Sequence, residues 1–407
     1  MNEATRALIE RFGTPLYVYR RDRVRSAAAD LLAFLPGTSR LYYSLKANPH
    51  PAIVAELSGL GLYAELSSQG ELHTAEAAGH PMDRSLYTGP GKTAEEIRAA
   101  VKSGVRSFSV ESLADRSRLA AACRELGTDV EYLVRLNGGA TATGGLRMTG
   151  RASQFGTDID LGDELAELFT PLGGAQPVGA HLFSATNVAD CAKLLDELRL
   201  SVETIATALA ALAGPARLVD LGGGFSAPFA RPGARLDYTA LRHGLESALD
   251  AGLPGWREQR PAVAFESGRY LVGDSGTLYT TVLDVKRSRG STHVVLDAGV
   301  QTLGGMWGLG RLPTPSVQPL GDEDAAAAPV TLVGPLCTPL DVLGRNAAVP
   351  PPAVGDVLEV PNVGAYGLTA SLLGFLSRPI PVEVVLDHGD EIVHVRRLEL
   401  RPEGQPR

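Results

Sequence analysis

Lys46 is the residue whose position most favours covalent chemistry. It directly follows the apolar run Leu41–Leu45, and only five of the 38 lysines and arginines in the chain are lysines. Because residues two apart on a strand share one face, Tyr42, Ser44 and Lys46 are expected on the same side. A partly desolvated lysine at a strand end is suited to form a Schiff base with a carbonyl compound. A lysine that extends its ammonium from the strand end into solvent fits the same pattern.

Two glycine-containing segments follow strand-like runs later in the chain. The triplet Gly222–Gly224 comes after the run Leu218–Leu221, and Gly268 with Arg269 follows the run Ala262–Phe265. Glycines let backbone N–H groups approach an anion closely, and an arginine adds positive charge. A single glycine triplet also occurs at ordinary strand-to-helix turns. It is the pair of segments, at successive strand ends, that predicts a phosphate site.

Three further ionisable residues end predicted strands. A carboxylate at Glu266 could keep a pyridine nitrogen protonated, as pyridoxal phosphate requires when it accepts electrons. Glu266 could equally pair with Arg269. His181 could be a catalytic group, a group that contacts a bound cofactor ring, or a structural histidine. Arg135 could neutralise an anion or pair with a neighbouring carboxylate.

The elements that must position these residues alternate between strand-like runs and helical patterns over residues 40–266. The eight runs are Leu41–Leu45, Leu62–Leu66, Arg84–Thr88, Ser107–Val110, Val130–Leu136, Pro177–Leu182, Leu218–Leu221 and Ala262–Phe265. Eight strand–helix steps in roughly 230 residues fit a (β/α)₈ barrel, which typically takes ~250 residues. Functional groups of such barrels lie at the carboxyl ends of the strands. A doubly wound open sheet is the competing fold.

After Glu266 the strand-like runs occur without long helices between them, which indicates a mostly antiparallel β domain. These runs are Leu271–Val285, His293–Leu296, Val330–Val333, Val357–Val360, Ile380–Leu386 and Ile392–Val395. A strand at Thr14–Tyr19 could join them. The expected domains are therefore a barrel over residues 21–266 and a β domain formed by residues 1–20 and 267–407.

The composition of the chain disfavours several classes of binding partner and cofactor. A formal charge of −8 and the absence of Lys/Arg runs argue against nucleic acid or an anionic membrane as the main partner. The three cysteines lack CxxC spacing and the eight histidines form no HxH or HExxH pair, so neither a disulfide framework nor a dedicated metal centre is expected. The first eleven residues are polar, and no apolar stretch approaches the roughly 18 residues of a membrane span. A cytoplasmic location is expected.

Several segments, in order along nearly the whole chain, resemble the fold-type III decarboxylases, which include the diaminopimelate, ornithine and arginine decarboxylases. Each motif is modest alone, and the ordered set is specific. The segments are Tyr43–Asn48 (YSLKAN), Ser68–Leu72 (SQGEL), Gly89–Thr93 (GPGKT), Asp220–Phe225 (DLGGGF), Glu266–Tyr270 (ESGRY), Val333–Cys337 (VGPLC), Asp341, Gly355–Asp356 and Gly364–Tyr366 (GAY).

The resemblance implies an alanine-racemase-like barrel, with Lys46 carrying pyridoxal 5'-phosphate as a Schiff base. Glu266 would bond the pyridine nitrogen. Cys337 of the partner subunit would protonate the substrate carbon, because the family places its active sites at a homodimer interface where the β domain of one chain closes the barrel of the other. The phosphate region would be bound by Gly222, Gly223, Gly224, Gly268, Arg269 and Tyr366.

Two departures from the family pattern concern the cofactor. In the segment Gly179–Asn187 (GAHLFSATN), the histidine that usually stacks on the cofactor ring aligns with Phe183, whereas His181 matches the histidine two residues earlier. A phenylalanine can stack on the ring but cannot donate a hydrogen bond. Thr186 falls where a small hydroxyl residue helps to hold the phosphate.

A third departure concerns the substrate. Thr338 follows Cys337 at the position where diaminopimelate and ornithine decarboxylases have a carboxylate for the distal amino group. Threonine would leave a distal ammonium unpaired, which disfavours the standard diamino acids. The loop is more similar to a specialised-metabolism branch whose members act on unusual amino acids, some tethered to an acyl carrier protein. Thr338, Asp341 and Arg311 are expected to shape the side-chain pocket; Arg311 could equally be an exposed loop residue.

The implied activity is decarboxylation of an amino acid, free or carrier-bound, to an amine and carbon dioxide. A racemase on the same barrel is one alternative, although the segments around Glu266 and Cys337 are of the decarboxylase type. A non-catalytic paralogue that binds a partner protein is another. Such proteins typically lose the lysine or the phosphate residues, and this chain keeps both.

Overall fold

The computed structural model describes residues 1–138, 146–147, 152–304, 328–349 and 352–401. The chain divides into two compact units. The barrel unit contains Arg25–Ser226 and Leu236–Leu271, and the β unit contains Met1–Val24, Ala227–Arg235 and Val272–Arg407. The domain bounds expected from the sequence, 21–266 for the barrel, stay a prediction.

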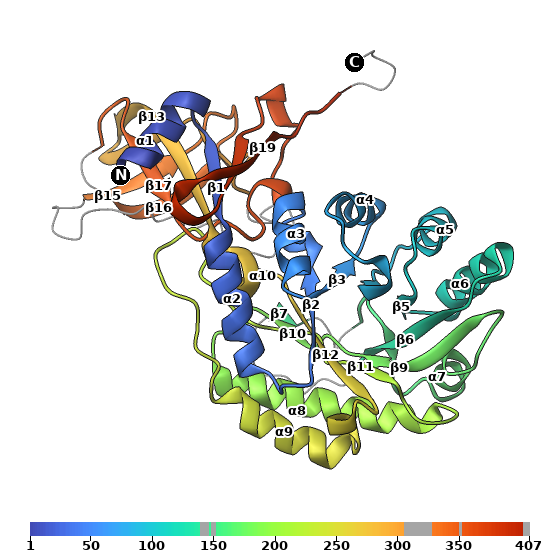
Figure 1. Ribbon diagram of the computed structural model, residues 1–407. Helices are drawn as coiled ribbons and strands as arrows, with labels where there is room; N and C mark the ends of the chain where they lie inside the picture. The colour runs from blue at the N-terminus through green and yellow to red at the C-terminus, as the bar shows by residue number, and fades with distance from the viewer. Residues whose placement is uncertain (139–145, 148–151, 305–327, 350–351, 402–407) are drawn as a thin grey trace. The chain divides into compact units, whose positions relative to one another are not determined.

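The barrel unit is built on eight parallel strands (Figure 1). They are β2 (Arg40–Ser44), β3 (Tyr63–Leu66), β4 (Ser85–Tyr87), β5 (Ser107–Val110), β6 (Val130–Asn137), β9 (Ala175–His181), β11 (Leu218–Asp220) and β12 (Ala262–Ser267). The ring closes because β5, the last strand on one side of the sheet, also pairs with β6 on the other. The predicted (β/α)₈ barrel is therefore confirmed, and the open sheet is wrong.

Helices connect the strands and surround them (Figure 1). They are α2 (Arg21–Phe34), α3 (Pro51–Gly59), α4 (Gln69–Ala77), α5 (Ala94–Lys102), α6 (Leu113–Leu126), α7 (Gly162–Leu168), α8 (Cys191–Ala208) and α9 (Leu241–Gly252). Local sequence sets their ends. At α6, the Ser112 side chain accepts from the Asp115 N–H, and Gly127 adopts a left-handed conformation with φ 59°. Both residues are common at helix ends for these reasons.

An apolar layer fills the barrel interior below the carboxyl ends of the strands. Its buried members are Tyr42, Leu86, Leu133, Val178, Leu218, Ala262 and Ala264. Barrel interiors are filled in such layers by residues that alternate along each strand. For Tyr42, Leu86, Leu133, Leu218 and Ala264, the residue two positions further along the chain lies on the same face and nearer the carboxyl end, where it can form the next layer.

The β unit contains a mostly antiparallel sheet with the order β16-β15-β14-β13-β1-β18-β19, and β17 also pairs with β13. As expected, β1 (Leu16–Arg20) joins this sheet, and α1 (Glu3–Phe12) packs on it through Leu8. The remaining strands are β13 (Gly276–Ser288), β14 (Ser291–Leu296), β15 (Ala328–Val333), β16 (Val342–Val349), β17 (Val357–Val360), β18 (Val382–Leu386) and β19 (Ile392–Arg397).

Two details of this unit differ from the sequence expectation. The strand expected from Leu271 begins at Gly276, because the preceding residues form helix α10 (Arg269–Val272) and a 3₁₀ turn. Strand β16 is not among the expected runs. Its interior contains Arg345 and Asn346, the latter with φ 55°, which interrupt the alternating pattern on which strand prediction depends.

No helix in the described part of the chain is both long enough and apolar enough to cross a membrane.

Candidate active site

A layer of eight polar side chains caps the apolar layer of the barrel, with one residue from each strand or from the position just after it. All are at least nine-tenths buried. Register supports a common face, since Ser44 pairs with Glu65 and His181 pairs with both Asp220 and Arg135. We call this set the polar layer: Ser44, Glu65, Thr88, Ser109, Arg135, His181, Asp220 and Glu266.

Lys46 lies in a 3₁₀ turn, η1 (Leu45–Ala47), immediately after β2. Its Nζ is 2.8 Å from Glu65 Oε1 and 3.0 Å from Glu65 Oε2, and 43% of its side chain is exposed. Its Nζ also lies 5.9 Å from the centre of the Phe183 ring. The lysine therefore stands at the mouth of the barrel, paired with a carboxylate of the polar layer.

Glu65 is the polar-layer residue that holds Lys46. Burial opposes ionisation of Glu65, but the charge of Lys46 and hydrogen bonds from Lys46, Ser44 and Thr88 outweigh it and lower the pKa of Glu65. The Thr88 hydroxyl donates to Glu65 Oε1 at 2.9 Å. Glu65 is therefore an anion, and Lys46 forms an ion pair with it.

Glu266, His181 and Asp220 meet on the other side of the polar layer. His181 Nε2 lies 3.4 Å from Glu266 Oε1, and one ligand atom from each of the three residues lies within 4.8 Å of the others. Burial, and then the charges of Glu65 and Asp220, raise the pKa of Glu266 well above its usual range. Burial also raises the pKa of Asp220, to about 7.

The same three residues carry buried atoms without hydrogen-bond partners. Glu266 Oε1, His181 Nε2 and Asp220 Oδ2 all lack one among the described residues. An unpaired buried polar atom is costly, and such atoms cluster where a ligand will satisfy them. This grouping suits the nitrogen of a bound ring. Its spacing would also admit a metal ion, and the expected absence of a metal centre stays a prediction.

The glycine turn lies next to this cluster. Gly222 has φ 64° and Gly224 has φ 119°, both in the left-handed region that favours glycine. A Cβ on Gly222 would come within 2.7 Å of Phe183, and one on Gly223 would collide with the carbonyl oxygen of Glu266. The turn therefore requires glycine, and its backbone passes close to Phe183 and to the Glu266 carbonyl, a close approach of the kind that a phosphate-binding turn uses.

Other predicted cofactor contacts of the barrel unit lie on segments next to this turn. Gly268 packs against the lysine turn, because a Cβ there would come within 2.7 Å of Ala47 Cβ. Arg269 is the first residue of α10. Thr186 lies in the short strand β10 (Ala185–Thr186), which pairs with β7 (Leu146–Arg147). The cofactor roles predicted for these residues stay predictions.

The remaining predicted site residues belong to the β unit or lie outside the described residues. Cys337 is exposed, and the Thr338 hydroxyl accepts from the Leu340 N–H at 3.3 Å. Tyr366 has φ 55°. Arg311 lies outside the described residues.

Asp341 is buried and bonded to the backbone, which the sequence did not suggest. It is 3% exposed, and its carboxylate accepts from the backbone N–H groups of Val300 and Leu336, each at 2.8 Å. These bonds favour a structural role in the loop that carries Cys337, whereas the pocket role predicted for Asp341 stays a prediction.

Sequence reasoning missed several members of the polar layer. Glu65, Thr88 and Ser109 received no role, and Asp220 was noted only as part of a motif. A signal for them exists in the alternation along each strand. A polar residue follows a buried apolar one by two positions in Leu86/Thr88 and Leu218/Asp220, for example.

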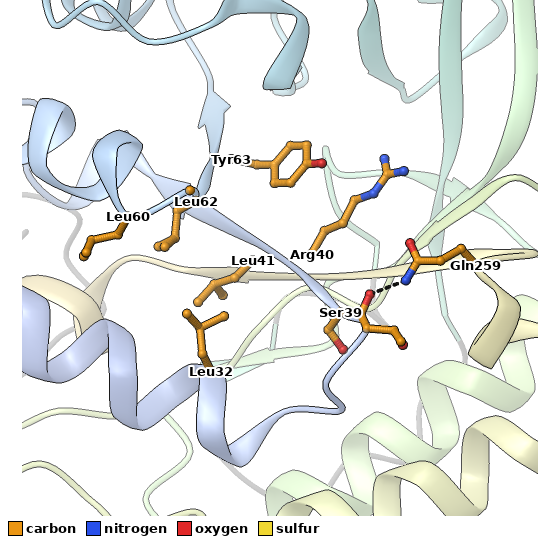
Figure 2. A pocket seen from close by; sticks show the side chains of 10 residues that line it. Leu32, Ser39, Arg40, Leu41, Leu60, Leu62, Tyr63 and Gln259 are labelled. Atoms are coloured by element: carbon orange, nitrogen blue, oxygen red, sulfur yellow. Dashed lines mark hydrogen bonds between the residues drawn. The ribbon is translucent and has the colours of Figure 1, made fainter.

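A cavity lies at the opposite end of the strands (Figure 2). It has a volume of about 350 Å³ and is lined by residues at or near the amino ends of β2 and β3, including Arg40, Leu62 and Tyr63. It contains none of the polar layer. The buried charges at the carboxyl end, and not this cavity, therefore mark the candidate site.

A closed parallel barrel with a lysine and a buried carboxylate at the carboxyl ends of its strands defines a barrel enzyme of the Schiff-base type. The chain belongs to the pyridoxal-dependent decarboxylase family, since the model of that family's pyridoxal binding domain matches residues 21–273. It is an enzyme that uses pyridoxal phosphate to decarboxylate an amino acid, giving an amine and carbon dioxide. The predicted family, activity and cofactor are confirmed.

Similar proteins fall within the same class. The chain is 28% identical over 397 residues to an L-glutamyl-[BtrI acyl-carrier protein] decarboxylase of Niallia circulans, covering 94% of this chain and 91% of the relative. It is 31% identical over 401 residues to a diaminopimelate decarboxylase of Archaeoglobus fulgidus, covering 96% and 92%. A crystal structure of diaminopimelate decarboxylase from Helicobacter pylori complexed with L-lysine superposes with a TM-score of 0.83 at 25% identity, covering 97% of each chain.

Proposed function

We propose that Lys46 and Glu266 hold pyridoxal phosphate at the mouth of the barrel and that the substrate is an amino acid without a distal ammonium group. The observation that carries the first part is the unpaired, buried Oε1 of Glu266 in the polar layer that also holds Lys46. When bound, the cofactor withdraws electrons from the carbon that loses its carboxylate. The protein must supply orientation and charge.

Glu266 supports that chemistry through its charge. Burial beside Asp220 and Glu65 makes an isolated Glu266 carboxylate unfavourable. A cationic N–H placed against it relieves this cost, because an opposite charge favours the ionised form. Glu266 would therefore hold a ring nitrogen in its protonated state. Phe183 would lie along the ring. The phosphate would be bound by the N–H groups of Gly223 and Gly224 together with Gly268, Arg269, Thr186 and Tyr366, on a turn that Gly222 anchors by donating its own N–H to Asp220 Oδ1 at 2.8 Å.

Two groups would move protons during turnover. Lys46 must leave its ion pair with Glu65 and give up a proton before its amine can react. Cys337, on an exposed loop of the β unit, would give a proton to the substrate carbon in a homodimer where it reaches the partner's barrel. The homodimer itself is part of this proposal.

Subunit mixing tests the homodimer. Lys46→Ala and Cys337→Ala proteins would each be inactive alone, and random exchange should restore about a quarter of the wild-type activity, because one site in the mixed dimer is intact. A mixture that stays inactive after exchange is verified would contradict the shared site.

The substrate proposal rests on Thr338 and on the relative that acts on a carrier-bound glutamate. A neutral threonine after Cys337 gives no countercharge to a distal ammonium. An amino acid with a neutral or carrier-linked side chain avoids this problem. We therefore propose an unusual or acyl-carrier-bound amino acid as the substrate.

Carbon dioxide release from free amino acids and from aminoacyl carrier proteins tests this substrate class. We expect little turnover of diaminopimelate, lysine and ornithine, and a gain of diamino acid turnover in Thr338→Glu, with Thr338→Gln as the uncharged control of similar size. Efficient decarboxylation of diaminopimelate by the unchanged enzyme would refute the substrate proposal and leave the cofactor site untouched. The cytoplasmic location also stays a prediction, which cell fractionation would test.

A further inference from the structure

His181 connects two strands of the barrel through its two ring nitrogens. The Nδ1 atom lies 2.9 Å from the Ser109 hydroxyl on β5, and the Nε2 atom lies 3.4 Å from Glu266 Oε1 on β12. All three side chains are almost completely buried, with exposed fractions of 0% to 2%. Ser109 is itself anchored, because Lys92 Nζ donates to its backbone carbonyl at 2.8 Å.

We propose that His181 is a positioning residue for Glu266: its neutral imidazole accepts a hydrogen bond from Ser109 at Nδ1 and directs its Nε2 N–H toward Glu266 Oε1, and this 3.4 Å contact, which is not a hydrogen bond in the structure, becomes one when Glu266 is ionised against the ring nitrogen. This inference rests on the proposed pairing of Glu266 with the cofactor nitrogen. It assigns a task to the histidine that the sequence left open between catalysis and structure.

The charge of the site requires a neutral imidazole. Burial, and then the positive charges of Arg135, Lys46 and Lys92, lower the pKa of His181 well below its usual range. A neutral imidazole has a single N–H, and the hydrogen bond at one nitrogen decides which nitrogen carries it. With Nδ1 accepting from Ser109, the N–H is at Nε2 and faces Glu266.

Glu266 needs such a donor because its surroundings oppose its charge. Glu65 and Asp220 are carboxyl groups of the same layer, and both raise the pKa of Glu266. A hydrogen bond to an ionised carboxylate stabilises that ionised form and limits rotation of the side chain. His181 would thereby fix one oxygen of Glu266 and keep the carboxylate charged for the ring nitrogen.

Two substitutions separate this role from simple packing. The amide nitrogen of His181→Gln can reach the place of Nε2, whereas the shorter His181→Asn reaches only the place of Nδ1. We expect His181→Asn to raise the dissociation constant of pyridoxal phosphate and to lower kcat by about ten- to a hundredfold, the range found when a supporting hydrogen bond to a charged site group is lost. His181→Gln should recover most of both losses.

A matched control comes from a second buried histidine. His80 Nδ1 lies 2.9 Å from the Ser58 hydroxyl, so its environment is similar, but it contacts no polar-layer residue in the described contacts. His80→Asn should leave cofactor affinity unchanged. ¹⁵N NMR of labelled histidine in the loaded enzyme should assign the proton of His181 to Nε2, with His181→Gln identifying the signal, and Ser109→Ala should shift this tautomer balance.

The outcomes distinguish this inference from the proposed function. If Glu266→Gln impairs cofactor binding but His181→Asn does not, the role of His181 is wrong and the cofactor site stands. If Glu266→Gln binds the cofactor normally, the proposed pairing itself fails. A proton on Nδ1, or an effect of Asp220→Asn equal to that of His181→Asn, would show that His181 does not serve Glu266 and would overturn the inference.

Discussion

The two ends of the barrel strands differ sharply in the number of ionisable side chains that they bury. At the carboxyl end, the polar layer places three carboxyl groups, an arginine and an imidazole almost out of reach of solvent. At the amino end, the cavity of Figure 2 is lined by four leucines and by uncharged polar residues, and its one charged lining residue, Arg40, stacks over Tyr63 at 5.5 Å. The described cavity therefore lies at the end that lacks the buried ionisable groups.

This difference indicates that buried ionisable atoms locate the active site better than a cavity does. Burying a charge costs free energy, so a buried set of unpaired ionisable atoms persists where it serves a ligand or a reaction. The cavity at the amino end contains no such set of buried ionisable atoms. The comparison therefore predicts large effects from changes at the carboxyl end and small ones at the amino end.

Lys46→Arg should have the largest effect. Arginine keeps the positive charge beside Glu65 but cannot form the covalent link to the cofactor. We expect kcat to fall by at least about a thousandfold, near the upper range for loss of a group that takes part in proton transfer, and the visible absorbance of bound cofactor to change. Lys193→Arg, on the outer helix α8, is the control. Activity within tenfold of wild type would remove Lys46 from the mechanism.

Lys92→Met tests a buried lysine near the same end. Lys92 Nζ is 2.8 Å from Asp115, and both side chains are at most 3% exposed. Removing one partner leaves an uncompensated buried charge, so we expect a loss of about 3–5 kcal/mol in the free energy of unfolding. Denaturant unfolding would measure it.

The double variant Lys92→Met/Asp115→Leu is the informative control for this pair. It removes both charges, and it should recover much of the loss because no buried charge is left unpaired. A double variant as unstable as Lys92→Met would instead point to lost packing or to the hydrogen bonds from Lys92 to backbone carbonyls.

Sequence reasoning succeeded best where local patterns decide the structure. The eight barrel strands are short apolar runs separated by helical patterns, and caps such as Ser112 are encoded within a few residues. Lys46, Glu266 and the glycine turn were found because each follows a strand directly. Strand β16 was missed because Arg345 and Asn346 break its pattern.

The polar layer was harder to predict because its partners are distant in sequence. Lys46 and Glu65 are separated by 19 residues, and Ser109 and His181 by 72. Nothing local indicates that such residues meet, since closure of the barrel brings them together.

Asp220→Asn tests the buried charge at the carboxyl end through the pH dependence of the free energy of unfolding. The folded protein raises the pKa of Asp220 to about 7, so it keeps a proton that the unfolded chain releases near pH 4. The free energy of unfolding of the cofactor-free enzyme should therefore fall as pH rises from about 4 to 7, by at most about 1.4 kcal/mol per pH unit from this group.

Asparagine removes that proton equilibrium while its carbonyl oxygen can still accept from the Gly222 N–H. The cofactor-free Asp220→Asn protein should be more stable than wild type at pH 8 and similar to it at pH 4, as thermal unfolding across this range would reveal. Asp196→Asn, whose side chain is 73% exposed, is the control and should change neither value. A flat difference across pH would contradict the raised pKa.

Arg40→Ala should have the smallest effect because it changes only the amino end. Tyr63 lies beneath two guanidinium groups there, Arg40 at 5.5 Å and Arg84 at 4.5 Å from its ring centre. Loss of one such contact at a partly exposed site costs about 0.5–1 kcal/mol. We expect a slightly lower Tm and kcat/KM within twofold of wild type, with the exposed Arg199→Ala as the control. A tenfold loss of kcat/KM without a matching loss of stability would mean that the amino end of the barrel contributes to the reaction, and the contrast between the two ends would then fail.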